Sequence, residues 1–251
     1  MIKTSLIIIG GRGSRMGNLT HNKPKCLLKV GNFTILCHLF TQLRYLKVKK
    51  IILCTGYLDH VIKKYCKKKL VPDSNNLIKK LKKNIQFLDL PKIVFSKSSV
   101  DNSTSNRLIK AKKDIKEERF LFLYGDTLLK PNINQMINLM DKKKLNGVIT
   151  ISNPPSNFGQ IKTSKDLITD FEEKQIIKDV WVNSGWMIIK TKILKQLKKT
   201  TVNFENYLFK NEIKKKKLGF YKNKGLYFPL DRVHDLKKAS TIFKTKKITW
   251  Y

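Results

Sequence analysis

The chain has 251 residues, 41% of them hydrophobic, and its 53 Lys and Arg outweigh 18 Asp and Glu to give a net charge of +35. This length is enough for one well-buried α/β domain, and no apolar run approaches a membrane span, so we expect no membrane partner. The cations are scattered without an RNP-like aromatic motif or a Cys/His finger, which argues against a specific nucleic-acid partner and favours compositional bias with weak, nonspecific polyanion binding.

The first predicted element is a buried strand over Leu6–Ile9, which is too short and too evenly apolar for an amphipathic helix. Glycines follow this strand at once and cations come soon after: Gly10, Gly11, Gly13, Arg15, Lys23 and Lys25. Glycines let backbone N–H groups approach a ligand, and together with the cations they suit a bound polyphosphate. The loop lacks the third glycine of the dinucleotide fingerprint and the Gly-Lys-Ser/Thr of the phosphate loop. An ordinary strand-to-loop connection is the alternative.

Beyond this loop, short β-rich runs alternate with longer amphipathic segments. Thr34 is expected to cap a helix over Ile35–Leu46, whose apolar residues recur at helical spacing. Further strands are predicted over Ile51–Cys54, Ile93–Phe95, Phe120–Tyr124 and Val148–Ile151, and further helices over Leu58–Lys69, Arg107–Lys113 and Pro131–Asp141. This alternation predicts an α/β fold with a mostly parallel, doubly wound sheet that binds its ligand at the carboxyl edge.

The last third of the chain follows a loop at Pro154-Pro155 and predicts extended structure over the same edge of the sheet. The extended segments are Gln160–Ile161, Leu167–Phe171 and Trp181–Ile189, followed by Tyr227–Leu230 and a helix from about His234. No internal repeat, Pro/Ser-rich linker or break in composition divides the chain. We therefore expect a single domain over residues 1–251.

Two carboxylates stand where strand-like runs end. Asp126 follows the predicted strand Phe120–Tyr124 after one glycine, and Asp231 directly follows Tyr227–Leu230. Either could be a turn residue that accepts local N–H bonds. We favour a second interpretation, in which both hold Mg²⁺ against a phosphate, because this ion needs only one or two carboxylates and keeps most of its waters.

Several motifs occur together in a recognisable order. They are the glycine turn, Lys23-Pro24-Lys25, Cys54-Thr55-Gly56-Tyr57, Tyr124-Gly125-Asp126, Asn153-Pro154-Pro155-Ser156-Asn157-Phe158-Gly159, Phe171-Glu172-Glu173-Lys174, Trp181-Val182-Asn183-Ser184-Gly185 and Phe228-Pro229-Leu230-Asp231. In this order they resemble the sugar-1-phosphate nucleotidylyltransferases, and the glucose-1-phosphate cytidylyltransferases most closely. The resemblance runs from the first strand to the last helix.

The resemblance implies a Rossmann-like nucleotidyltransferase core over about residues 1–150. A sugar-binding part with a C-terminal metal-ligand segment would follow over about residues 151–251. It implies the reaction of CTP with α-D-glucose 1-phosphate to CDP-glucose and pyrophosphate, with Mg²⁺. The alternatives are a nucleotidyltransferase for another sugar 1-phosphate or phosphocholine, and a non-catalytic nucleotide- or RNA-binding protein.

The resemblance also assigns roles position by position. Arg15 and Lys25 would be catalytic, with Lys25 bridging the reacting phosphates. The nucleotide would be bound by Gly10, Gly11, Gly13, Ser14, Lys23 and Gly125, with Thr104 and Arg107 near the cytosine. The sugar phosphate would be bound by Glu173, Lys174 and Asn183, and the metal by Asp126 and Asp231.

Cysteine usage bears on the compartment in which the chain works. The four cysteines are widely spaced and form no C-x-x-C pair, which argues against zinc and disulfides and favours a reducing cytoplasm. The N-terminal apolar segment is too short for the core of a signal peptide. The sequence leaves the oligomeric state open, a homo-oligomer included.

Overall fold

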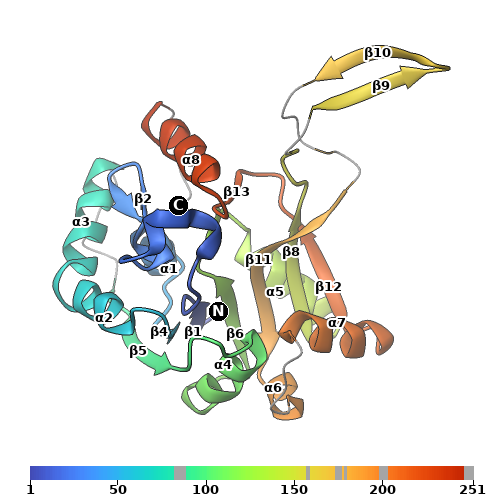
Figure 1. Cartoon of the computed structure of the whole chain (residues 1–251). Coiled ribbons are helices and arrows are strands. Elements are labelled where there is room, and N and C mark those ends of the chain that lie inside the picture. Colours follow the sequence, from blue (N-terminus) through green and yellow to red (C-terminus); the bar gives the residue numbers. More distant parts are fainter. Residues whose placement is uncertain (82–88, 157–158, 173–176, 178–179, 198–202, 246–251) are drawn as a thin grey trace.

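The computed structural model describes residues 1–81, 89–156, 159–172, 177, 180–197 and 203–245 (Figure 1). Its centre is a seven-stranded sheet in the order β12-β8-β11-β6-β1-β4-β5. These strands are β1 Thr4–Ile8, β4 Lys50–Thr55, β5 Lys92–Lys97, β6 Arg119–Tyr124, β8 Gly147–Ser152, β11 Val182–Lys190 and β12 Leu218–Lys222. Strand β11 runs antiparallel to both neighbours, and the other pairs are parallel. The predicted mostly parallel α/β sheet is confirmed.

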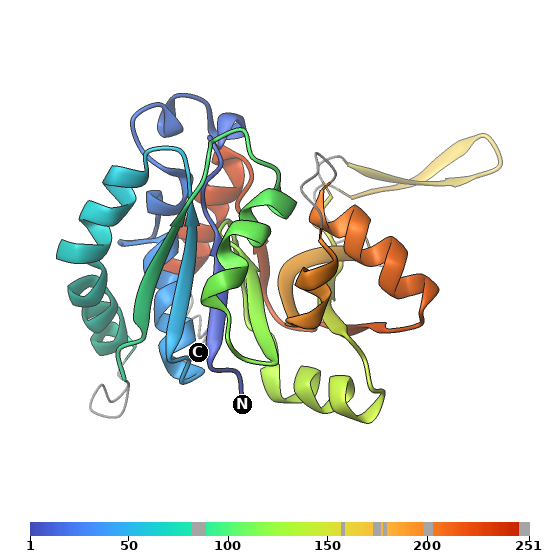
Figure 2. The same cartoon turned by 90° about the horizontal axis from the view of Figure 1, so that it is seen from below.

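Helices cover both faces of the sheet, because successive strand residues point to opposite sides. Leu6 packs in one core and Ile7 in the other. Ile7 shares its core with α1 Ile35–Tyr45, α2 Asp59–Lys68, α3 Leu70–Lys80, α5 Ile133–Lys142 and α8 Val233–Thr245. Leu6 shares the other with α4 Thr104–Ala111, α6 Lys192–Gln196 and α7 Phe204–Lys214. Figure 2 shows α4 and α7 in front of the sheet and α8 behind it.

Several helix boundaries follow from local chemistry. Thr34 caps α1 as expected, with its hydroxyl accepting the Cys37 N–H at 3.0 Å. Helix α3 was not predicted, because Pro72 and a polar run interrupt its apolar pattern. Pro72 is tolerated there because it lies in the first turn, where no backbone N–H is needed for the helix. Helix α7 and the short edge strand β12 were also not predicted.

The region after Pro155 differs from the sequence-based expectation. The segment Trp181–Ile189 was expected to extend over the carboxyl edge, but β11 lies inside the sheet, where residues 184–189 are buried. The segments Gln160–Ile161 and Leu167–Phe171 are extended, as predicted. They belong to an antiparallel hairpin of β9 Gln160–Ser164 and β10 Leu167–Glu172. This hairpin projects away from the body of the molecule (Figure 1).

Two small ladders complete the structure. Strands β2 Lys29–Val30 and β3 Phe33–Thr34 form a tight hairpin before α1. Strands β7 Thr127–Leu129 and β13 Tyr227–Pro229 pair antiparallel across about a hundred residues of chain. Because β11 and β12 lie in the same sheet as β1, strands of both halves form one sheet. The functional division of the chain near residue 150 stays a prediction.

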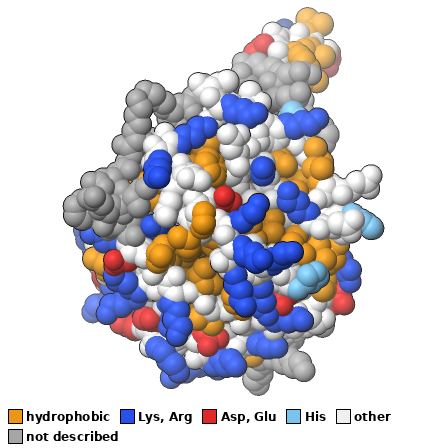
Figure 3. All heavy atoms as spheres, turned by 90° about the vertical axis from the view of Figure 1, so that its left-hand side faces the viewer, with side chains coloured by type: hydrophobic (Ala, Val, Ile, Leu, Met, Phe, Trp, Pro, Cys, Tyr) orange, Lys and Arg blue, Asp and Glu red, His pale blue; other side chains and the backbone are white. Residues whose placement is uncertain are grey.

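The surface is rich in Lys and Arg. On the face drawn in Figure 3 these side chains are spread over the molecule, with Asp and Glu between them. Among the described residues, no helix is long and apolar enough to cross a membrane. The four cysteines are free thiols and buried, and burial raises the pKa of Cys37, Cys54 and Cys66 to about 12.

Candidate functional site

A pocket of about 280 Å³ opens at the carboxyl edge of the sheet, next to the ends of β1 and β6. It is lined by Ile8, Ile9, Gly11, Gly13, Ser14, Arg15, Lys25, Cys26, Tyr124, Gly125, Asp126 and Asp231. Eight of the residues predicted from the sequence are among these, drawn from the glycine loop, the Lys-Pro-Lys segment and both carboxylate segments. The carboxyl edge of a parallel sheet is where such folds bind their ligands.

Gly13 shapes the loop that forms one wall of the pocket. Its backbone is left-handed, with φ 68° and ψ 31°, and a short 3₁₀ segment over Ser14–Thr20 begins directly after it. Its carbonyl accepts the Met16 N–H at 2.9 Å and the Thr20 hydroxyl at 3.0 Å. A Cβ on Gly13 would lie 3.0 Å from the Lys25 Cβ. Glycine therefore allows both the turn and the close approach of Lys25.

The pairing of β7 with β13 brings Asp126 and Asp231 together. Asp126 immediately precedes β7, and its carbonyl accepts the Leu230 N–H at 2.9 Å, one residue before Asp231. Thr127 lies opposite Pro229 in the same ladder. The two aspartates are far apart in sequence, yet a backbone register fixes their separation in space.

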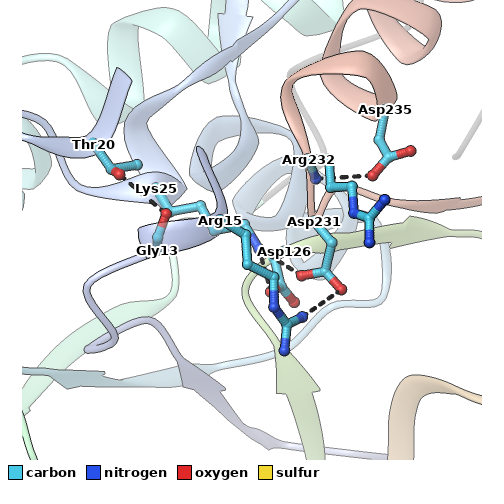
Figure 4. Close-up of polar contacts among 8 residues, drawn as sticks. All are labelled: Gly13, Arg15, Thr20, Lys25, Asp126, Asp231, Arg232 and Asp235. Carbon is cyan, nitrogen blue, oxygen red and sulfur yellow. Dashed lines mark hydrogen bonds and ion pairs between the residues drawn. The ribbon is translucent and has the colours of Figure 1, made fainter. Parts of the chain in front are cut away.

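Lys25 lies between these two carboxylates (Figure 4). Its Nζ is 2.7 Å from Asp126 Oδ2 and 2.9 Å from Asp231 Oδ1, and the side chain is only 14% exposed. Arg15 Nη1 donates to Asp231 Oδ2 at 3.1 Å. The catalytic pair and the metal-binding pair predicted from the sequence therefore form one connected cluster of two cations and two carboxylates.

The cluster holds its charges in the ionised form. Burial alone would lower the pKa of Lys25, but the carboxylates of Asp126 and Asp231 raise this pKa above its usual value. Burial alone would raise the pKa of Asp231, but hydrogen bonds and charge from Lys25 and Arg15 lower this pKa below its usual value. An ammonium and a carboxylate therefore face each other throughout the neutral pH range.

Helix α8 fixes the backbone that carries Asp231. The Asp235 carboxylate accepts the Arg232 N–H at 2.8 Å, which caps the first turn of the helix (Figure 4). Further along, Phe243 packs its ring on Gly31 and edge-on against His38, with ring centroids 4.8 Å apart. The helix thereby ties Asp231 to the β2–β3 hairpin, which directly follows the Lys25 segment.

Other predicted residues lie outside the pocket lining. Gly10 is a buried residue of the glycine loop, Lys23 is exposed and Thr104 begins α4. Asn183 lies on β11, where its side-chain oxygen accepts the Gly185 N–H at 3.0 Å. Glu173 and Lys174 fall outside the described residues.

Arg107 is buried, and its guanidinium donates to Gly10 O at 3.3 Å, so the Arg107 side chain contacts the backbone of the glycine loop. Sequence reasoning did not assign Tyr124 and Cys26 to the site, although both line the pocket. The signal was their position beside Gly125-Asp126 and Lys25.

The arrangement can bind a polyphosphate. Gly11 and Gly13 present loop backbone beside Arg15 and Lys25, and these cations suit phosphate oxygens. The two carboxylates face the same space and are suited to a divalent cation, which commonly accompanies a nucleoside triphosphate. Binding a nucleotide with its metal is the chemistry that this constellation favours.

Comparisons with known proteins find relatives along nearly the whole length of the chain. A probable glucose-1-phosphate cytidylyltransferase of Bacillus subtilis (strain 168) is 28% identical over 250 residues, which cover 98% of each chain. A D-glycero-alpha-D-manno-heptose 1-phosphate guanylyltransferase of Campylobacter jejuni is 24% identical over 82% of this chain and 85% of that protein. The fold also matches the crystal structure of UDP-glucose pyrophosphorylase complexed with UDP-glucose, with a TM-score of 0.71, 18% identity and coverage of 97% and 99%.

The family profile described as nucleotidyl transferase matches residues 4–228, which include the glycine loop, Lys25 and Asp126. Residues 4–228 span nine-tenths of the chain and every strand of the central sheet. The resemblance predicted from the motifs is therefore confirmed. The chain belongs to the nucleotidyl transferase family.

Proposed function

We propose that this protein is a sugar-1-phosphate nucleotidylyltransferase that uses CTP and α-D-glucose 1-phosphate and releases pyrophosphate and CDP-glucose. The observation that carries the proposal is the position of the Lys25 ammonium, 2.7 Å and 2.9 Å from two carboxylates at the mouth of a glycine loop. Such a cluster serves phosphoryl-type transfer, where positioning and charge neutralisation supply most of the rate.

Mg²⁺ fits the donor set that the chain offers. Asp126 and Asp231 each direct a carboxylate oxygen at the Lys25 ammonium, so the two carboxylates lie close enough to share a cation, and Mg²⁺ at phosphate-transfer sites takes one or two carboxylates plus phosphates and waters. No group of three or more His, Cys, Asp or Glu that could hold a metal occurs among the described residues, so substrate oxygens would complete the shell. When bound, the ion supplies positive charge to the triphosphate and so favours departure of pyrophosphate.

The reaction needs no protein nucleophile. A phosphate oxygen of the sugar phosphate attacks the α-phosphorus of the nucleotide, a new P–O bond forms, and the bond to pyrophosphate breaks on the opposite side. Lys25 remains an ammonium, because its pKa is raised, and can neutralise charge that develops on the phosphates. Arg15 and the loop amides of Gly11 and Gly13 would hold the triphosphate.

The choice of CTP and glucose 1-phosphate rests on the full-length similarity to the Bacillus subtilis relative and on the motif order. We assign base contacts to Thr104 and sugar-phosphate contacts to Glu173, Lys174 and Asn183. The Campylobacter jejuni relative, named for a guanylyl donor and a heptose 1-phosphate, marks the main rival. This rival function differs from the proposed one in both the nucleotide and the sugar phosphate, so a direct activity assay distinguishes the two.

The test is a matrix of the four ribonucleoside triphosphates against glucose 1-phosphate, other sugar 1-phosphates and phosphocholine, followed by pyrophosphate release. We expect the highest rate with CTP and glucose 1-phosphate, and loss of that rate when the metal is removed with EDTA and its recovery on adding Mg²⁺. A higher rate with another nucleotide and acceptor would mean that this pair, and not CTP with glucose 1-phosphate, is the substrate pair of the enzyme. Nucleotide binding without pyrophosphate release from any pair would refute the enzymatic proposal.

A further inference from the structure

The Arg107 side chain is buried and makes an unusually complete set of hydrogen bonds within the protein. A guanidinium carries five N–H groups. The five bonds run from Nε to Asn102 O at 3.2 Å, from Nη1 to Thr55 O at 3.2 Å and Ser98 Oγ at 2.9 Å, and from Nη2 to Gly10 O at 3.3 Å and Val100 O at 2.8 Å. Every donor of Arg107 is therefore already engaged.

These acceptors lie at or just beyond the carboxyl ends of three adjacent strands. One acceptor follows β1, one ends β4 and three follow β5, and these strands are neighbours in the sheet. The β1 and β4 loops also touch directly, since Gly10 O accepts the Tyr57 N–H at 3.0 Å. Arg107 is thus the side chain on which the β1, β4 and β5 loops converge.

The glycines around Arg107 make room for its guanidinium. A Cβ on Gly10 would lie 2.1 Å from Arg107 Nη1, and a Cβ on Gly56 would lie 2.8 Å from the same atom. Gly11 differs, because a Cβ there would meet nothing within 4 Å, and Gly11 lines the pocket. Of these two neighbouring loop glycines, Gly10 faces Arg107 and Gly11 faces the ligand space.

We propose that Arg107 is a positioning residue that sets the glycine loop against the loops after β4 and β5 and so shapes the nucleotide site, without contacting the base. The resemblance instead implied a contact near the cytosine. A guanidinium that gives all five N–H groups to the protein would have to break a buried bond to reach a base, which costs free energy. The activity tests of this inference rest on the proposed function.

The kinetic test compares Arg107→Lys with the wild type. A lysine has three donors on a flexible stem and cannot span the five acceptors, so we expect the loop to shift and kcat/KM for the nucleotide to fall about 100-fold. The ratio of kcat/KM between CTP and UTP should stay at the wild-type value, because no base contact is lost. A changed ratio, or wild-type kinetics, would overturn the positioning role.

Arg44→Lys is the matched control. Arg44 is equally buried, and its Nη1 donates to Ser74 Oγ at 2.9 Å and Asn75 Oδ1 at 2.8 Å, between α1 and α3. This variant should keep the kinetic constants of the wild type even where its melting temperature falls. Equal kinetic losses in both arginine variants would mean that general destabilisation explains the effect, and the inference would fail.

A second measurement does not depend on activity. Hydrogen exchange of the amides at residues 10–13 and 98–102 should speed up in Arg107→Lys and stay at the wild-type rate in Arg44→Lys. If the wild type shows no turnover with any substrate pair, the proposed function fails, while this exchange result still decides the role of Arg107. Unchanged exchange in Arg107→Lys would refute the inference.

A milder variant covers the case in which Arg107→Lys does not fold. Ser98→Ala removes one acceptor of Nη1 and leaves the bond to Thr55 O in place. We expect the same pattern on a smaller scale, with kcat/KM lowered about 5-fold, the CTP to UTP ratio unchanged and faster exchange at residues 10–13. An altered ratio without a change in exchange would contradict the inference.

Discussion

The Lys25 ammonium faces two carboxylates that are partly open to solvent, with exposed fractions of 35% for Asp126 and 45% for Asp231. Water can therefore solvate both carboxylates when the ammonium is absent, so removing it should cost activity more than stability. The same exposure leaves room for substrate oxygens beside the carboxylates. Lys25, Asp126 and Asp231 therefore share one small space that is partly open to solvent.

We predict that Lys25→Ala and Asp126→Ala each lower kcat about 100- to 1,000-fold, the usual effect of losing one charged contact to a transition state. Both variants should keep the circular dichroism spectrum of the wild type. Lys29→Ala, an exposed lysine four residues from Lys25, is the control and should retain wild-type turnover. Near-normal turnover in either site variant would remove that residue from the mechanism.

The pKa of Asp231 leads to a prediction for stability against pH. Its folded-state pKa is below the usual value of 3.8, mainly because Lys25 and Arg15 outweigh the effect of burial. A carboxylate with a lowered pKa stabilises the fold above its unfolded-state pKa, and this contribution is lost as the pH falls through the folded-state pKa. The difference in unfolding free energy between the wild type and Asp231→Asn should therefore be constant from about pH 5 to pH 9.

Urea unfolding of both proteins over that range tests the prediction, and the difference should shrink below about pH 4. Lys25 does not disturb the plateau, because its pKa is raised above 10.5 and its contribution is lost only as the pH rises through that higher value. A difference that declined between pH 5 and pH 7 would assign the effect to another group.

The sequence was enough to predict Asp126 and Asp231 as site residues, because each follows an apolar run and the motif order resembles a known family. It could not show that Lys25 lies between them, since that depends on the register of β7 against β13. Nor could it show the engagement of Arg107. A count of satisfied donors needs the positions of backbone carbonyls at the ends of three strands.

At the scale of elements, α8 links the stability of the C-terminal region to the position of Asp231, the residue that we propose as a metal ligand. Asp231 lies two residues before the helix, and the helix is attached to β2 and Gly31 through Ser240 and Phe243. The β2–β3 hairpin in turn follows the segment that carries Lys25. A substitution near the C-terminal end of α8 that loosens the helix should therefore also shift Asp231 at its other end.

We predict that Phe243→Ala loosens α8 and lowers kcat, because a buried phenylalanine contributes about 3–5 kcal/mol and its loss frees the helix from Gly31 and His38. Limited proteolysis should cleave the variant within residues 232–245, and activity should fall in parallel. Lys238→Ala, at an exposed position on the same helix, should behave as the wild type. Unchanged activity after loss of the helix contact would separate α8 from the function of Asp231.

Elements with strong local signals were predictable. The capped helix α1 and the apolar strands β1, β4 and β6 follow from a capping threonine and from buried runs. Strand β11 was placed wrongly because its sequence does not show that it pairs antiparallel between β6 and β8. Its run over residues 186–189 is apolar, as in any buried strand. Topology of this kind depends on pairing between distant segments.

At the scale of the whole molecule, the net charge of +35 must affect how the protein meets polyanions. Counterion release makes such binding strongly dependent on salt, whether or not a dedicated site exists. A dedicated site would concentrate the effect in one place, whereas Figure 3 shows cations spread across a face with acids between them. The distribution of the cations over the surface therefore distinguishes a compositional bias toward lysine from a dedicated polyanion-binding site.

We predict weak binding to single-stranded DNA that is independent of sequence and falls steeply as salt rises from about 50 mM to 200 mM. Two triple variants locate its origin: Lys67→Gln, Lys68→Gln and Lys69→Gln at the end of α2, and Lys142→Gln, Lys143→Gln and Lys144→Gln at the end of α5. All six lysines are exposed. Because each variant removes three solvated charges, a diffuse field predicts equal losses of affinity and equal changes in salt slope, measured by fluorescence anisotropy. A loss confined to one variant, or a preference between two unrelated oligonucleotides, would instead indicate a localised nucleic-acid site and contradict compositional bias as the source of the charge.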